Sequence, residues 1–147
     1  MKNLFVATSV AFAMAGAVSA GETPSAPGAT VYMVNIEDGA TVKGPVKVVF
    51  GLTGMGVAPA GTEAENTGHH HMFVNRAPWG EGADDAEYNE NGIPSDDNHK
   101  HYGKGQTEAV YDLPPGTHTL QLVLGDLFHV PHNPPVVSQQ ITITVTE

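Results

Sequence analysis

Short segments in which apolar and polar residues alternate are the feature of this chain that most limits its fold. Near the C-terminus, Ile141 and Ile143 alternate with Thr142 and Thr144, and Gly- and Pro-rich turns separate this segment from similar ones. The segments are residues 30–36, 46–52, 70–74, 106–113, 117–124 and 136–145. Because side chains alternate between the two faces of a strand, the pattern predicts an all-β domain, an antiparallel sandwich of the immunoglobulin or fibronectin type.

Two further regions interrupt or precede that pattern. Residues 21–29 are rich in Pro, Ser, Ala and Gly, and we expect a flexible leader there, followed by one β-sandwich domain over residues 30–147. Residues 76–98 are polar and acidic, with Trp79, Tyr88 and Ile93 as isolated large side chains. We expect a long acidic insertion loop with one or two short helical turns, since a loop of this length is usually functional or mobile.

The first twenty residues predict a secretory signal peptide. Lys2 supplies a positive charge, residues 4–18 are apolar or small, and Val18, Ser19 and Ala20 form a small-residue cleavage site. The apolar run is short and rich in Ala and Gly for a membrane span, and a retained N-terminal anchor is the open alternative. We expect cleavage after Ala20 and a periplasmic or secreted protein that makes no membrane contact once the signal is removed.

The charge and the cysteine content narrow the partners and the ligands of this chain. It has 6 Lys and Arg against 16 Asp and Glu, a net charge of −10, and such a field repels nucleic acid and anionic lipid but attracts cations. It contains no cysteine, which excludes disulfides and thiolate metal sites. A transition-metal site in this chain must therefore use imidazole nitrogen, carboxylate oxygen or thioether sulfur.

Most of the 8 histidines fall in three groups, at residues 69–71, 99–101 and 129–132. In the predicted sandwich, the strand over 117–124 pairs antiparallel with the strand over 70–74, so the end of the former lies beside the start of the latter. The turn at residues 113–116 places the start of the strand over 106–113 at the same pole. All three groups are therefore expected to meet there, and the predicted metal ligands are His69, His71, His99, His101, His129 and His132.

The same geometry assigns roles to the remaining two histidines. The type of ligand then indicates the metal. His70 projects to the other side of its strand, and His118, about 20 Å from the predicted pole, is interpreted as structural. A hydrogen-bonded network of histidines that holds the 76–98 segment to the sandwich is the alternative to a metal site. Among first-row divalent ions, copper binds imidazole most tightly, so copper is the first choice and zinc the second.

Two other ligand types are less favoured. Met72 could supply a thioether to copper, but a methionine at this position also fits the core. The acidic segment could hold calcium through Asp84, Asp85, Asp96 and Asp97, although these acids do not have the spacing of an EF-hand.

Four segments carry a resemblance to a known family. They are Gly-His-His-His at 68–71, His-Lys-His-Tyr-Gly-Lys-Gly-Gln-Thr-Glu at 99–108, Leu-Pro-Pro-Gly-Thr-His-Thr-Leu-Gln-Leu at 113–122 and His-Val-Pro-His-Asn-Pro-Pro at 129–135. In combination they resemble a bacterial exported domain of unknown function, number 4399. The resemblance implies a small periplasmic single domain with histidines at these motif positions, but it implies no activity. At Leu127 and Phe128 similar sequences carry His or Asn, so no further ligand is implied there.

Three functional hypotheses follow. The leading one is a periplasmic protein that buffers, delivers or sequesters copper or zinc, together with a partner that exchanges the metal. The second is a metal-dependent enzyme at the same histidines, with Glu108 as a base and Tyr102 lining the site. The sequence contains no nucleophile elbow and no HExxH motif, so no catalytic residue is assigned. The third is an adhesion or interaction module, which predicts histidines that are dispersed in space.

Overall fold

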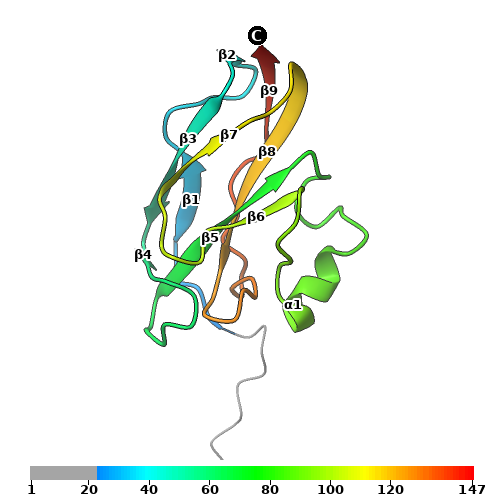
Figure 1. Ribbon diagram of the computed structural model, residues 1–147. Coiled ribbons are helices and arrows are strands. Elements are labelled where there is room, and N and C mark those ends of the chain that lie inside the picture. Colours follow the sequence, from blue (N-terminus) through cyan, green and yellow to red (C-terminus); the bar gives the residue numbers. More distant parts are fainter. Residues whose placement is uncertain (1–22) are drawn as a thin grey trace, which may run out of the picture.

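The computed structural model describes residues 23–147, which form two β-sheets and little helix (Figure 1). The predicted signal peptide and its cleavage site lie outside the described residues. The smaller sheet has the strand order β1 (Thr30–Met33), β3 (Val46–Thr53) and β7 (Glu108–Tyr111). The larger sheet has the order β2 (Thr41–Lys43), β9 (Ile141–Thr146), β8 (Gly116–Gly125), β5 (Thr67–Val74) and β4 (Gly56–Val57), and β6 (His99–His101) also pairs with β5. The domain is mostly β, as predicted.

Strand pairing follows the prediction in the middle of the larger sheet and departs from it at the edges. β5 pairs antiparallel with β8, as predicted, and β8 pairs antiparallel with β9. However, β2 runs parallel to β9, and β4 runs parallel to β5. The expectation of a purely antiparallel sheet is therefore wrong at these two places. Both added strands are short, and the free backbone groups of a strand edge can pair with an incoming segment in either direction.

The alternation in the sequence determines the core between the two sheets. On β9 the inward residues are buried, and the threonines between them are exposed. The buried cluster combines residues of β8 and β9 with residues of β3 and β5: Leu120, Leu122, Leu124, Ile141, Ile143, Val48, Phe50 and Met72. Met72 is thus a core residue and not a thioether ligand.

The 76–98 segment packs beside β5 and β6 on the other face of the larger sheet (Figure 1). It contains the short helices η1 (Asp85–Glu87) and α1 (Tyr88–Asn91), which agrees with the expected helical turns. A second apolar cluster joins Tyr88 and Ile93 of this segment to Phe73 of β5 and Val123 of β8. Side chains on both faces of β5 are therefore buried. Within residues 23–147, no helix has the length and apolar character needed to cross a bilayer.

Residues 23–29, expected as a flexible leader, contact the loop that follows β8. Thr23 Oγ1 donates to Asp126 Oδ2 at 2.6 Å, and the backbone N–H of Asn133 donates to Thr23 O at 2.9 Å. Pro24 forms a parallel bridge with Asn133. The start of the described chain therefore helps to hold the loop that carries His129 and His132.

Leu122 lies between the two sheets and is fully buried. We expect Leu122→Ala to lower the free energy of unfolding by about 2–5 kcal/mol, because it removes buried apolar surface and leaves a cavity. Urea unfolding followed by circular dichroism measures this change. Val110→Ala on β7 is the control, because Val110 is 64% exposed and its truncation should change the free energy by less than about 0.5 kcal/mol. Equal losses for the two variants would contradict the described core.

Candidate metal centre

Four histidines from three parts of the chain gather where β8 ends. His69 and His71 lie two residues apart on β5 and project to the same side of the strand. β6 pairs with β5 so that His101 stands opposite His71, and His129 comes from the loop after β8. One ring nitrogen of each residue lies within 4.8 Å of the others. We refer to these four residues as the four-histidine cluster.

Hydrogen bonds within the cluster cannot satisfy all of its nitrogens. His69 Nε2 lies 3.0 Å from His71 Nε2 and 3.1 Å from His129 Nδ1. A neutral imidazole nitrogen has either one N–H or one lone pair, so His69 Nε2 can form a good hydrogen bond with only one of these neighbours. The His101 ring stacks on the His71 ring with centroids 5.1 Å apart and meets the His129 ring edge-on at 4.5 Å. Nitrogens that converge in this way are typical of ligands to a shared cation.

Several buried nitrogens of the cluster have no hydrogen-bond partner among residues 23–147. They are His101 Nε2 and the Nδ1 atoms of His69 and His71. A buried polar group without a partner costs about 1–3 kcal/mol. If the Nε2 atoms of His69 and His71 direct lone pairs toward the centre, their Nδ1 atoms carry the ring protons. A metal-free cluster is therefore an unfavourable arrangement, and coordination at the central nitrogens would offset part of its cost.

Asp126 shapes the loop that presents His129, and the sequence analysis did not identify it. Its Oδ1 atom accepts hydrogen bonds from the backbone N–H groups of Phe128 at 2.8 Å and Val130 at 3.0 Å. His129, between them, has a φ of 69°, a left-handed conformation that is uncommon for residues other than glycine. An Asp that accepts from the N–H two residues later is a frequent turn signature, and Gly125-Asp126 is the signal that could have revealed it.

Two glycines leave the space that the histidine rings occupy. A Cβ atom at Gly125 would lie 2.7 Å from His71 Nε2, and a Cβ atom at Gly103 would overlap the ring of His101. Neither position can therefore accept a side chain unless a ring moves. The sequence analysis assigned no role to these glycines, because their effect depends on which ring packs against each of them in three dimensions.

Burial keeps three rings of the cluster, those of His69, His71 and His101, neutral near pH 7. Burial, and then the neighbouring rings of His101 and His129, lower the pKa of His69 from 6.5 to about 4. Burial and the adjacent histidines lower the pKa of His71 well below 6.5, and burial also lowers the pKa of His101. Because only a neutral imidazole can bind a metal, these rings are in the binding form at neutral pH.

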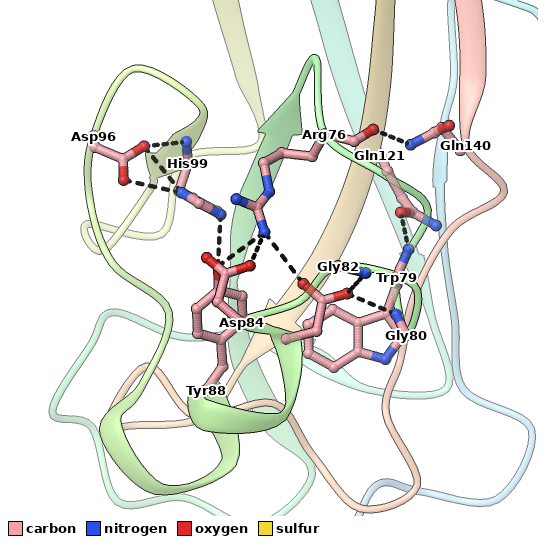
Figure 2. Close-up of polar contacts among 11 residues, drawn as sticks. Arg76, Trp79, Gly80, Gly82, Asp84, Tyr88, Asp96, His99, Gln121 and Gln140 are labelled. Atoms are coloured by element: carbon pink, nitrogen blue, oxygen red, sulfur yellow. Dashed lines mark hydrogen bonds and ion pairs between the residues drawn. The ribbon is translucent and has the colours of Figure 1, made fainter.

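The other two predicted ligands lie outside the four-histidine cluster. His99 projects to the same side of β6 as His101, but it pairs with Phe73 and lies roughly 6.6 Å farther along the sheet. Its ring nitrogens contact Asp96 at 2.9 Å and the Tyr88 hydroxyl at 3.0 Å (Figure 2). His132 Nε2 lies 3.1 Å from Thr67 O, and its Nδ1 atom lies 3.3 Å from Leu124 O. Protein oxygens thus lie beside these nitrogens, and of the six predicted ligands the structure brings four together: His69, His71, His101 and His129.

The structure agrees with the prediction that the remaining two histidines, His70 and His118, are not metal ligands. His70 lies on the opposite face of β5, where its ring packs 5.2 Å from the ring of Phe50. Burial lowers the pKa of His70 from 6.5 to about 4. His118, near the start of β8, has its Nε2 atom 2.8 Å from Pro114 O and is structural.

The side chains that the alternative hypotheses require are engaged elsewhere. Glu108 forms an ion pair with Lys47 at 3.0 Å on the smaller sheet, and the Tyr102 hydroxyl donates to the Tyr111 hydroxyl. The acids of the calcium alternative contact basic side chains: Asp84 and Asp85 contact Arg76, Asp96 contacts His99, and Asp97 contacts Lys100. These contacts support neither a base at Glu108 nor a calcium site in the 76–98 segment.

The lowered pKa values make the stability of the metal-free protein depend on pH. Unfolded histidines take up protons near pH 6.5, whereas folded His69 stays neutral down to about pH 4. We therefore expect the free energy of unfolding to fall as the pH is lowered through this window, by about 1.4 kcal/mol per histidine for each unit of pKa difference. Thermal unfolding across the window, with a chelator present, measures the effect. A melting temperature that is constant or rises as the pH falls would contradict the burial described here.

A family model matches residues 48–146, a range that includes all four histidines of the cluster. The family is described as a domain of unknown function, DUF4399. Comparisons with curated proteins and with solved structures find no match. Because the match covers more than half of the chain, and because the motifs at residues 68–71, 99–108, 113–122 and 129–135 indicated the same family, this chain belongs to the DUF4399 family.

Proposed function

We propose that this protein binds one copper or zinc ion through His69, His71, His101 and His129. The observation that carries the proposal is the convergence of one ring nitrogen from each residue to within 4.8 Å. An adhesion module predicts dispersed histidines, and the enzyme hypothesis relied on Glu108, which is paired with Lys47 instead. The geometry therefore favours metal binding over an adhesion module, and it does not support Glu108 as the base of a metal-dependent enzyme.

The donor set favours copper first and zinc second. The cluster offers only imidazole nitrogen, and copper(II) binds such ligands more tightly than other divalent ions of the first row. Zinc–nitrogen bonds of about 2.0–2.1 Å place the nitrogens of a tetrahedral site roughly 3.4 Å apart. The observed separations of 3.0 and 3.1 Å between cluster nitrogens are close to that value. The four ligand nitrogens lie within 4.8 Å of one another, so some of them must move closer together to surround an ion of either metal.

The burial of the ligands supports a role in metal exchange. His69 and His71 are fully buried, whereas His101 and His129 are partly exposed. A metal held on one side by buried ligands and on the other by accessible ones can pass to and from a partner. We therefore assign the protein to periplasmic buffering, delivery or sequestration of the metal, with a partner that exchanges it.

Other observations support the proposed location and the proposed fold class of this protein. A signal-like sequence over residues 1–20 supports export, and the lack of cysteine leaves imidazole as the main ligand type. The two sheets that enclose a common core support the immunoglobulin-type sandwich as the proposed fold class.

Titration of the untagged protein, processed at the predicted cleavage site, tests metal binding directly. We expect isothermal calorimetry to show one copper(II) or zinc ion per chain, with a dissociation constant at or below the micromolar range. Binding should weaken as the pH falls below about 6, because protonated imidazole cannot coordinate. A stoichiometry well below one ion per chain at micromolar protein would rule out the proposal.

Single substitutions identify the ligands. His101→Ala and His129→Ala each remove a partly exposed member of the cluster, and we expect each to weaken binding by about 10-fold or more. His118→Gln is the matched control, because it removes a buried histidine that contacts Pro114 O and lies outside the cluster. Equal affinities for the three variants would show that the metal binds somewhere else.

Gly125→Ala tests whether backbone space determines the position of His71. The added methyl group would lie 2.7 Å from His71 Nε2, so the ring must move away from the other ligands. We expect metal affinity to fall by about 10-fold, since displaced ligands lose coordination geometry. Gly56→Ala on β4 is the control, because a Cβ atom there would meet its nearest neighbour at 3.6 Å. Unchanged affinity in Gly125→Ala would show that His71 is not a ligand.

A further inference from the structure

We propose that the 76–98 segment positions the two partly exposed ligands of the metal centre, and that Tyr88 is its central positioning residue. This inference rests on the proposed function, because it concerns the same four histidines. Tyr88 touches none of them, so it would act through the residues that hold their backbone. Figure 2 shows the contacts of Tyr88 with Asp84, Arg76 and His99, from which this role is argued.

The four ligands differ in how firmly the sheets hold them. His69 and His71 lie on β5, which is hydrogen-bonded to β8 along one side and to β4 and β6 along the other. His101 lies on β6, a strand of three residues that pairs, among the described strands, only with β5. His129 lies in a loop. The relative positions of the four ligands therefore depend on the contacts that fix β6 and the loop that carries His129.

The first link runs from Tyr88 to His99. The Tyr88 hydroxyl lies 3.0 Å from His99 Nε2, donates to Asp84 Oδ2 at 2.8 Å and accepts from Arg76 Nη2 at 3.2 Å (Figure 2). Arg76 lies two residues after the end of β5 and also pairs with Asp84. Tyr88 and His99 are 4% and 3% exposed, so these contacts form in a water-poor environment where hydrogen bonds are strong.

The second link runs from His99 to the start of β6. Asp96 Oδ1 lies 2.9 Å from His99 Nδ1 and accepts the backbone N–H groups of Asn98 at 2.8 Å and His99 at 2.9 Å. These bonds fix both the ring and the backbone of His99. His101 is two residues farther along the same short strand, so its position opposite His71 follows from the position of His99.

The third link runs from α1 to His129. α1 begins at Tyr88 and ends before Gly92, and the next residue, Ile93, donates its backbone N–H to His129 O at 2.8 Å. A Cβ atom at Gly92 would lie only 3.0 Å from Phe128 O, which shows how closely this turn approaches the loop. Ile93 and Tyr88 belong to the same apolar cluster on the sheet. Tyr88 therefore anchors the segment that contacts His129 directly and that fixes, through His99, the strand that carries His101.

Tyr88→Phe tests this role, because it removes the hydroxyl and keeps the ring that packs on Phe73 and Trp79. Using copper(II) alone as the probe, we expect the dissociation constant to rise by about 10-fold and the electron paramagnetic resonance spectrum of the bound ion to change. Tyr111→Phe is the matched control, because it removes a buried hydroxyl that contacts Tyr102 on the other side of the sheet. The control should keep the wild-type affinity and spectrum.

The outcomes separate this inference from the proposed function. A wild-type protein that binds no copper(II) removes both. Wild-type binding together with an unchanged affinity and spectrum in Tyr88→Phe overturns only the inference, even if the melting temperature of the metal-free variant falls. Asp96→Ala, at a side chain that is 52% exposed, breaks the same link without altering the apolar cluster. It should shift the affinity and the spectrum in the same direction, and a wild-type result would also overturn the inference.

Discussion

The four-histidine cluster depends on the register between β5 and β8. In this register His69 stands opposite Gly125, and His71 stands opposite Val123. A shift of one residue would turn both histidines into the core between the sheets and His70 outward, because side chains alternate along a strand. Apolar side chains on both faces of the two strands hold the register: one face packs against the smaller sheet and the other against the 76–98 segment. The hydrophobic core thus selects which imidazoles face the loop after β8.

The cluster by itself is unfavourable for folding, and the packing around it offsets that cost. Four imidazoles lie close together, and several of their buried nitrogens have no protein partner. Burial lowers the pKa values of His69 and His71, so the rings do not relieve the arrangement by taking up protons near neutral pH. Four acids of the 76–98 segment, Asp84, Asp85, Asp96 and Asp97, are paired with Arg76, His99 and Lys100 instead of with the cluster. The result is a nitrogen-only site in an acidic protein, which is the kind of environment that favours a borderline divalent cation.

Particular residues show how far the sequence could predict the site. Alternation along a strand correctly placed His69 and His71 on one side and His70 on the other. The same argument placed His99 with His101, and the two do share a face, but a strand advances too far in two residues for both to reach one ion unless the rings converge. The rings of His69 and His71 converge, whereas the ring of His99 is held by Asp96 and Tyr88. These contacts depend on how the 76–98 segment folds back onto β6, which strand alternation does not reveal.

The sequence by itself determined the β character of the chain, the chemistry of the available ligands and the strand that carries His69 and His71. These properties follow from local alternation and from residue types, which act over a few neighbouring positions. Only the tertiary structure decided that His101 and His129 complete the cluster, that His132 bonds to backbone oxygens, and that short parallel strands close the sheet edges. Those outcomes depend on register, on the turn that Asp126 stabilises and on the space left by Gly103 and Gly125, all of which arise from contacts between residues far apart in the chain.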